Sequence, residues 1–240
     1  MLSKLKKVKS ALYRFLFVKK RPLESNGERI EIDISKNKIN YDKLDLYQKS
    51  HFKRYEFALT ALTPAGITGD FACGSGYGSV MLSQKSTKVI GMDLNKHVVE
   101  QITKRYGKVE NVEFVQGNLL NLSYSCMFDN IVSFETVEHL KEDYIPDLFK
   151  VFSRALKPGG RLVFSTPYMQ AKSQEAVSMG FHLTFDIDEN TIKGWLTANG
   201  LQAEIIKYQN YETHLIEDNL PKKDFIICVS KKLSDSVTVS

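Results

Sequence analysis

Residues 69–79 read GDFACGSGYGS, and this stretch decides the fold that the sequence predicts. A short apolar strand leads into glycines, which let the backbone turn sharply and let a ligand approach closely. The helix that follows points its N-terminal N–H groups into the same crevice. The next strand, 88–92, ends at Asp93, an acid placed to accept hydrogen bonds from ribose hydroxyls. The unit therefore predicts a site for a ligand that contains ribose.

The pattern outside this stretch alternates between strands and helices. Predicted strands lie at 69–72, 88–92, 112–116, 130–134, 161–165, 202–209 and 224–230, and predicted helices at 47–62, 79–84, 96–106, 144–156 and 188–198. This alternation is typical of an α/β fold with a doubly wound, mostly parallel sheet. We expect the last two strands to form a hairpin that closes one edge, and 168–185 to be a loop or small insertion.

The loop also discriminates between two classes of ligand. A nicotinamide dinucleotide fingerprint requires glycine at position 79, where this chain has Ser79. Asp70 would repel a pyrophosphate, whereas it suits the ammonium group of S-adenosylmethionine. The loop therefore favours S-adenosylmethionine as the cofactor, with S-adenosylhomocysteine as the product. An oxidoreductase that uses a nicotinamide cofactor stays open as a competing interpretation.

The sequence resembles the class I S-adenosylmethionine-dependent methyltransferases over about 47–200. The matching segments are GDFACGSGYGS (69–79), VIGMDLN (89–95), NVEFVQGNLLNL (111–122), FDNIVSFETVEHL (128–140) and RALKPGGRLVFSTP (154–167). The resemblance is specific because five segments occur in the family's order. It implies a Rossmann-like sheet of seven strands with an antiparallel last strand.

The resemblance also implies which residues bind the cofactor. Ala72, Gly74 and Gly76 would line its methionine end, Asp93 would bind the ribose, and Leu94 or Met92 would pack on the adenine. Asn118 stands where the family usually has an aspartate that accepts a bond from the adenine amino group, and it is also interpretable as a turn residue. The remaining cofactor-binding candidates are Leu119, Phe134, Glu135 and Arg54, the last through the cofactor carboxylate.

A hydroxyl acceptor must lose a proton on methylation, and histidine suits that transfer. His139 follows the fourth strand beside Glu138, a pair that related methyltransferases often carry, and His182 lies where the family builds its acceptor pocket. We expect His139, His182 and Glu138 to be the catalytic residues. A structural hydrogen bond that orders the loop is the alternative role for His139.

Charge and cysteine content narrow the expected partners, compartment and metal sites. Residues 1–21 hold eight basic residues and no acidic one, so the rest of the chain carries a net charge of −3 and nucleic acid is not an expected partner. Residues 1–21 form a basic amphipathic pattern that suits a membrane surface or a partner. Three scattered cysteines fit a reducing cytoplasm, and no Cys/His spacing indicates a metal site.

Three regions are expected: a basic segment and extended lead-in at 1–42, a methyltransferase domain at 43–231 and a disordered tail at 232–240. Segments 46–58 and 134–140 resemble bacterial methyltransferases of surface-glycan assembly. The expected reaction is O-methylation of a small molecule or of a sugar of a bacterial surface glycan, in the cytoplasm or at the inner face of the membrane. N- or C-methylation of a small molecule and cofactor binding without catalysis stay open, as does the oligomeric state.

Overall fold

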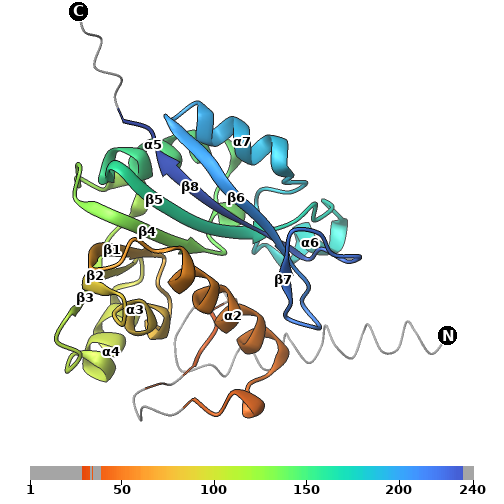
Figure 1. The fold of residues 1–240 in the computed structure, drawn as a ribbon. Helices are drawn as coiled ribbons and strands as arrows, with labels where there is room; N and C mark the ends of the chain where they lie inside the picture. Colours follow the sequence, from red (N-terminus) through yellow and green to blue (C-terminus); the bar gives the residue numbers. More distant parts are fainter. Residues whose placement is uncertain (1–28, 33, 35–38, 235–240) are drawn as a thin grey trace, which may run out of the picture.

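The structure is a computed structural model that describes residues 29–32, 34 and 39–234, and these residues form one eight-stranded sheet (Figure 1). The order of the strands is β3-β2-β1-β4-β5-β8-β6-β7. Their bounds are β1 Gly66–Phe71, β2 Ser86–Asp93, β3 Val112–Gln116, β4 Phe128–Phe134, β5 Leu156–Pro167, β6 Leu201–Gln209, β7 Ile216–Glu217 and β8 Phe225–Lys232. Strands β1 to β5 pair in parallel, whereas β8 is antiparallel to both β5 and β6. The predicted α/β sheet with an antiparallel last strand is confirmed.

The far edge of the sheet has one strand more than expected. The described residues contain an eighth strand, the two-residue β7, which pairs with the end of β6. Within the pair formed by the last two predicted strands, β8 is the inner one, because it lies between β5 and β6. Residues 226–230 of β8 are all buried, as expected for an interior strand with both faces covered. The expected antiparallel pairing of the last two predicted strands at this edge is confirmed, because β6 pairs antiparallel with β8.

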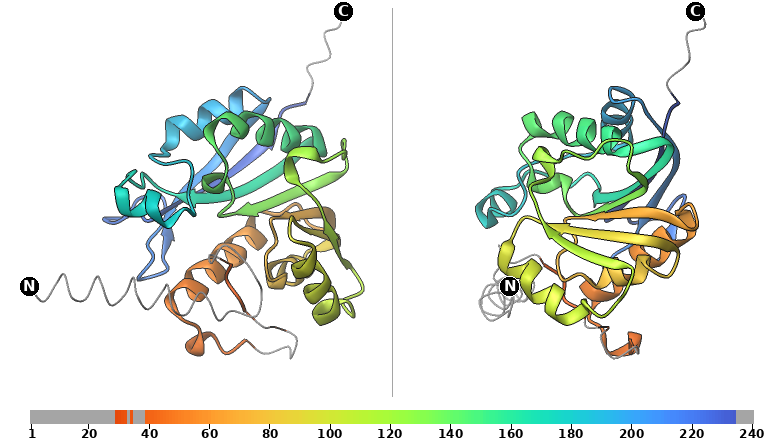
Figure 2. Two further views of the ribbon diagram at one scale, coloured as in Figure 1. Left: turned by 180° about the vertical axis from the view of Figure 1, so that it is seen from behind. Right: turned by 90° about the vertical axis from the view of Figure 1, so that its left-hand side faces the viewer.

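Helices cover both faces of the sheet (Figure 2). They are α2 Leu46–Ala61, α3 Tyr77–Leu82, α4 Lys96–Tyr106, α5 Ile145–Ala155, α6 Gln174–Met179 and α7 Glu189–Thr197, with 3-10 turns η1 Tyr41–Lys43, η2 Leu119–Asn121, η3 Val137–His139 and η4 Glu142–Tyr144. Helices α2, α3 and α4 lie on one face, and α5 and α7 lie on the other. Helix α6 falls within the segment predicted as a loop or insertion.

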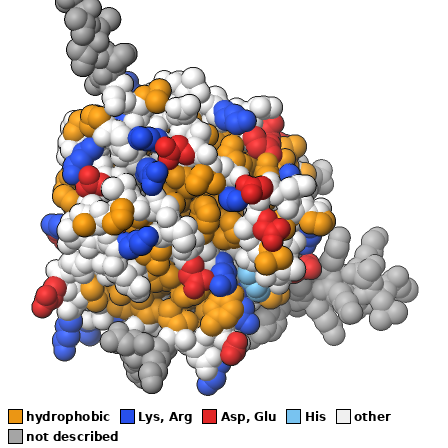
Figure 3. Space-filling model, viewed as in Figure 1, with side chains coloured by type: hydrophobic (Ala, Val, Ile, Leu, Met, Phe, Trp, Pro, Cys, Tyr) orange, Lys and Arg blue, Asp and Glu red, His pale blue; other side chains and the backbone are white. Residues whose placement is uncertain are grey.

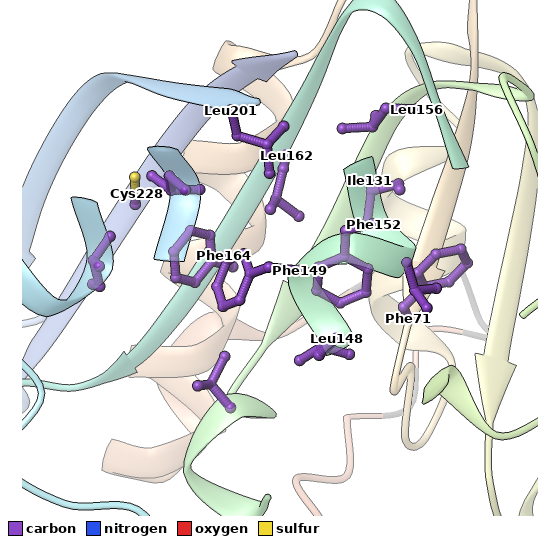
Figure 4. Packing of buried hydrophobic residues seen from close by; sticks show 14 of the residues in the cluster. Phe71, Ile131, Leu148, Phe149, Phe152, Leu156, Leu162, Phe164, Leu201 and Cys228 are labelled. Carbon is purple, nitrogen blue, oxygen red and sulfur yellow. The ribbon is translucent and has the colours of Figure 1, made fainter. Parts of the chain in front are cut away.

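Each face has its own hydrophobic core. The core under α5 and α7 includes stacked and edge-on phenylalanines, among them Phe71, Phe149, Phe152 and Phe164 (Figure 4). The core on the other face joins α2, α3 and α4 to the sheet. Together these cores bury both sides of β1, β2 and β4, so the carboxyl ends of these strands are held at one rigid edge.

Local sequence signals explain where the helices that flank the site begin and end. Asp45 and Gln48 form a reciprocal capping box at the start of α2. Asn95 caps α4 by accepting from two backbone N–H groups, which places α4 directly after the end of β2. Helix α5 ends at Ala155, close to the predicted position, and β5 begins at once through the Lys157–Gly160 segment.

The surface and the chain ends bear on the remaining expectations. On the face in Figure 3, acidic and basic side chains are interspersed, with apolar patches between them. In the described ranges no helix is long and apolar enough to cross a membrane. The predicted basic helix at 1–21 and the last residues of the predicted tail, 235–240, lie outside the described residues. Strand β8 runs to Lys232, so the ordered sheet includes the first position of the predicted tail.

Candidate active site

The glycine loop lies between β1 and α3, at the carboxyl edge of the sheet. Ala72, Gly74 and Gly76 all have positive φ, at 60°, 55° and 75°. For Ala72 this is a conformation that side chains disfavour, so the fold must hold it in place. Cys73 anchors the loop by donating its N–H to the carbonyl of Met92 on β2, at 2.9 Å. The loop is therefore a defined turn that is held against the end of the neighbouring strand, β2.

Asp93 lies opposite the loop, as the sequence predicts. It is 7% exposed, and its carboxylate accepts bonds from the backbone N–H of Gly74 at 3.1 Å and of Asn95 at 2.9 Å. These bonds fix the carboxylate at the rim between β2 and the loop. A carboxylate has about four lone-pair positions, and Arg29 Nη2 lies 3.3 Å and 3.5 Å from its two oxygens, so ribose hydroxyls would compete with Arg29 for the positions that the backbone leaves.

Arg29 is the neighbour of Asp93 that the sequence analysis missed. Its Nη2 lies 3.3 Å from Asp93 Oδ1, and its aliphatic stem lies over Gly74. Hydrogen bonds from Ser75 Oγ to the Ile30 carbonyl and from Gln48 Nε2 to the Glu31 carbonyl hold this lead-in segment in place. The segment therefore covers the ribose end of the loop. No local motif identifies Arg29, because it lies 64 residues from Asp93.

The candidates for the adenine end occupy different environments. Leu94 is 65% exposed, which leaves an apolar surface beside Asp93, whereas Met92 is 4% exposed and belongs to the core. Of the two, Leu94 is placed to pack on an adenine. Asn118 is exposed and its Oδ1 accepts the N–H of Leu120, which is the turn role that the sequence analysis left open. Leu119 packs against the core.

Asp70 does not face the crevice, which corrects the expectation that it would suit a ligand's ammonium group. It is fully buried, and its carboxylate accepts hydrogen bonds from Tyr55 at 3.0 Å and Ser79 at 2.6 Å. Burial raises the pKa of Asp70 to about 6, although these two hydrogen bonds act in the opposite direction. Asp70 therefore ties the glycine loop to α2 and α3 from below.

An aromatic and cationic group lines the expected methionine end. Phe134 is 4% exposed and packs edge-on against Tyr55, with ring centroids 5.0 Å apart. His51 Nδ1 lies 2.5 Å from the Tyr77 hydroxyl, and burial followed by the charge of Arg54 lowers the pKa of His51 well below its usual value. A histidine in this environment is neutral near pH 7. The sequence analysis assigned no site role to His51 or Tyr77.

Arg54 is one of the largest fully buried side chains of the described chain, at 2% exposure. Its Nη1 donates to Gln209 Oε1 at 2.8 Å, and its guanidinium stacks 4.3 Å from the Phe225 ring centroid. Both partners belong to the ends of β6 and β8, so α2 carries this cation over the same edge of the sheet. The role expected for Arg54 toward the cofactor carboxylate stays a prediction, because the described contacts of its guanidinium are with Gln209 and Phe225.

Glu135 follows β4 with a positive φ of 49° and accepts a hydrogen bond from Ser165 at 2.7 Å. Next to it, the structure gathers Glu138, His139 and His182, the three predicted catalytic residues. One ligand atom of each lies within 4.8 Å of the others. The sequence analysis predicted no metal site, and these three side chains are close enough together to be candidate ligands for one. Local spacing could not reveal the group, because His182 is 43 residues from His139 in the sequence.

Comparisons with known proteins show that the chain is similar in sequence to methyltransferases. Residues 69–160 match the family described as "Methyltransferase domain". A "probable S-adenosylmethionine-dependent methyltransferase" of Mycolicibacterium smegmatis is 33% identical over 122 residues, which are 48% of this chain and 45% of that protein. The demethylmenaquinone methyltransferase of Lactococcus lactis is 33% identical over 150 residues, 58% of each chain. The matches thus span about half the length of these curated relatives.

Solved structures show the same fold. The N-methyltransferase NodS of Bradyrhizobium japonicum, in complex with S-adenosylhomocysteine, has a TM-score of 0.62 at 16% identity, covering 80% of this chain and 90% of that one. Sequence and fold comparisons together confirm the resemblance to class I methyltransferases, and S-adenosylmethionine is the cofactor of that class.

Proposed function

We propose that this chain, whose residues 69–160 form a methyltransferase domain of the class I S-adenosylmethionine-dependent type, methylates a hydroxyl group of a small molecule or of a sugar of a bacterial surface glycan. The observation that carries the proposed methyl donor is the geometry of Asp93, whose carboxylate two backbone N–H groups hold at the end of β2, opposite the glycine loop.

The residues present fit S-adenosylmethionine from end to end. Asp93 offers acceptors to the ribose, and Leu94 offers an exposed apolar surface to the adenine. Arg54 brings a buried positive charge to the opposite end, where it suits the methionine carboxylate. The third glycine of a dinucleotide fingerprint is replaced by Ser79, whose hydroxyl is used to hold Asp70. This arrangement supports the methyl donor over a dinucleotide.

When bound, the cofactor supplies a methyl group on a sulfonium that is already electrophilic. The chain therefore has to align an acceptor with that methyl group and take up the proton of a hydroxyl. Phe134 and Glu135 lie at the end of β4 beside the expected sulfonium, and the Glu138–His139–His182 group follows on the acceptor side. Acid–base groups on that side favour a hydroxyl acceptor, for which proton removal matters most.

The experiment is methyl transfer from S-adenosylmethionine labelled with ¹³C in its methyl group. The chain is incubated with a panel of sugar hydroxyls, small-molecule hydroxyls and amines, and the carbon chemical shift of the transferred methyl group identifies its new neighbour. We expect an O–CH₃ signal. An N–CH₃ or C–CH₃ product would contradict the hydroxyl assignment, and tight cofactor binding without transfer to any acceptor would favour a non-catalytic role.

The basic segment 1–21 suggests where the reaction takes place. We propose that the chain acts in the cytoplasm, with this segment on the inner face of the membrane, close to glycan intermediates. The −3 net charge of the rest of the chain supports this assignment, because the positive excess is concentrated in that segment.

A further inference from the structure

We infer that Glu138, His139 and His182 form a binding site for a divalent transition-metal cation. The three side chains come from two separate segments, the 3-10 turn η3 after β4 and the loop after α6. One ligand atom of each lies within 4.8 Å of the others. Ligands about 2.1 Å from one metal ion lie about 3–3.5 Å apart, so small side-chain rotations close the site around an ion.

Hydrogen bonds orient both imidazoles for this role. His139 Nδ1 lies 2.7 Å from the carbonyl oxygen of Phe181, which only accepts, so Nδ1 carries a proton and the neutral ring has its lone pair on Nε2. His182 Nδ1 lies 2.5 Å from Gln170 Oε1 and has the same arrangement. A metal-binding histidine almost always donates its other ring N–H to such an acceptor, which fixes the ring and raises its basicity.

The backbone holds the two segments together at this point. Leu183 N–H donates to the Glu138 carbonyl at 2.7 Å, and Thr184 Oγ1 donates to the Leu140 carbonyl at 2.7 Å. These bonds keep His182 beside His139, with ring centroids 5.2 Å apart. The ligand set is therefore built by the fold rather than by chance contacts of surface side chains.

The burial and the charge of Glu138 suit the binding of a cation. Glu138 is 1% exposed, and Thr166 donates to its Oε2 at 3.1 Å. A nearby positive charge stabilises a buried carboxylate, and a divalent ion held by the three ligands would add such a charge. Both histidines are partly exposed, which leaves a route for the ion from solvent.

The donor set indicates the class of ion. Two imidazole nitrogens and one carboxylate suit Zn²⁺, Fe²⁺, Mn²⁺ and Co²⁺, whereas Mg²⁺ prefers oxygen ligands only. Three protein ligands leave positions open for an acceptor oxygen. A cation at this site would lower the pKa of an acceptor hydroxyl bound to it. This role of the cation rests on the proposed function. With the ion bound, the three side chains act as ligands in place of bases, so the proton leaves to solvent, an oxygen lone pair forms the O–CH₃ bond, and the S–CH₃ electrons pass to sulfur.

The test is a titration of the full chain, stripped with a chelator, with Co²⁺ as a spectroscopic probe and Zn²⁺ by calorimetry. We expect one equivalent of Co²⁺ to bind with ligand-field absorption bands, and Mg²⁺ to bind more weakly. His182→Asn should weaken Co²⁺ binding at least tenfold. His97→Asn is the matched control, because His97 is exposed at the start of α4, and it should leave binding unchanged.

A parallel titration with S-adenosylhomocysteine separates this site from the cofactor site and reports whether each variant is folded. We expect His182→Asn to retain S-adenosylhomocysteine binding while losing Co²⁺. If Gln170→Leu, which removes only the partner of His182 Nδ1, also weakens Co²⁺ binding, the ring orientation is supported. Co²⁺ binding that is absent, or equal in wild type and His182→Asn, would overturn the metal site and leave the cofactor assignment intact.

Discussion

The cofactor end and the acceptor end of the crevice lie at the same edge of the sheet but are assembled differently. The cofactor end is nearly continuous in sequence, because the loop, α3 and Asp93 all fall within residues 69–93. Its shape comes mainly from backbone N–H groups and glycines. The acceptor end joins side chains from η3 and from the loop after α6, which are about 40 residues apart.

This difference explains what each end contributes. A continuous backbone unit gives a rigid site for a ligand that every member of a family shares. Side chains from distant loops are the part of a fold that varies most easily, so they suit recognition of the acceptor. The predictions below change the cofactor end, and the third also measures whether the acceptor end responds.

The largest expected effect is from Gly78→Ala at the cofactor end. A Cβ at Gly78 would lie 2.0 Å from Tyr55 Cζ, within the aromatic group that supports the loop. We expect a loss of about 3 kcal/mol in the free energy of unfolding, measured with denaturant. Gly194→Ala in α7 is the control, since nothing lies within 4 Å of its Cβ position. An unchanged stability for Gly78→Ala would show that Tyr55 does not pack there.

The second prediction concerns Asp70, which supports the loop from below. Its pKa is about 6 in the folded chain against 3.8 ordinarily, so the folded state binds the proton more tightly than the unfolded state. Its contribution to stability is therefore fully present below pH 4 and is lost as the pH rises through 6. The shift corresponds to about 3 kcal/mol.

Asp70→Asn should remove this loss, so the stability of the variant relative to wild type should increase between pH 4 and pH 7. Chemical unfolding at both pH values measures it, with Asp143→Asn at an exposed position as the control. A difference between variant and wild type that stays constant with pH would contradict the raised pKa.

The third prediction is Asp93→Ala, which removes the ribose acceptor. We expect the affinity for S-adenosylhomocysteine to fall by about 1–3 kcal/mol, the range for loss of a charged hydrogen bond. Calorimetry measures the change, and Asp143→Ala serves as the control. Co²⁺ binding at the acceptor end should be unaffected, and a loss at both ends would show that the two are not separate.

The smallest expected effect is from Leu94→Ala, which removes apolar surface beside the expected adenine. Because the side chain is 65% exposed, its loss should leave the free energy of unfolding almost unchanged. Cofactor affinity should fall by about 1 kcal/mol, the value of a few methylene groups covered by a ring. Unchanged cofactor affinity would show that the adenine does not pack on Leu94.

The cofactor end could be predicted from sequence because its signals are local. Helix α4 occupies the predicted residues 96–106, since Asn95 caps it directly after the strand. Asp93 likewise lies where the spacing after the glycine loop places it. In each case the residues that determine the structure are close neighbours in the chain.

Long-range contacts explain what the sequence analysis missed. Arg29 contacts Asp93, and Gln209 accepts a hydrogen bond from Arg54, which is 155 residues away in the sequence. Neither contact produces a local sequence pattern. Asp70 carries a carboxylate of the kind that binds ligands, but it is buried. Tyr55 on α2 and Ser79 on α3 both donate hydrogen bonds to it. The insertion of β8 between β5 and β6 depends on pairing that alternation alone does not determine.

The most direct test of the central claim is a calorimetric comparison of S-adenosylhomocysteine with NAD as ligands of the full chain. The geometry of the glycine loop and Asp93 predicts that S-adenosylhomocysteine binds at one site and that NAD binds more weakly. Asp93→Ala should then weaken S-adenosylhomocysteine binding. A preference for NAD, or an S-adenosylhomocysteine affinity that is the same with and without Asp93, would contradict the assignment of the methyl donor.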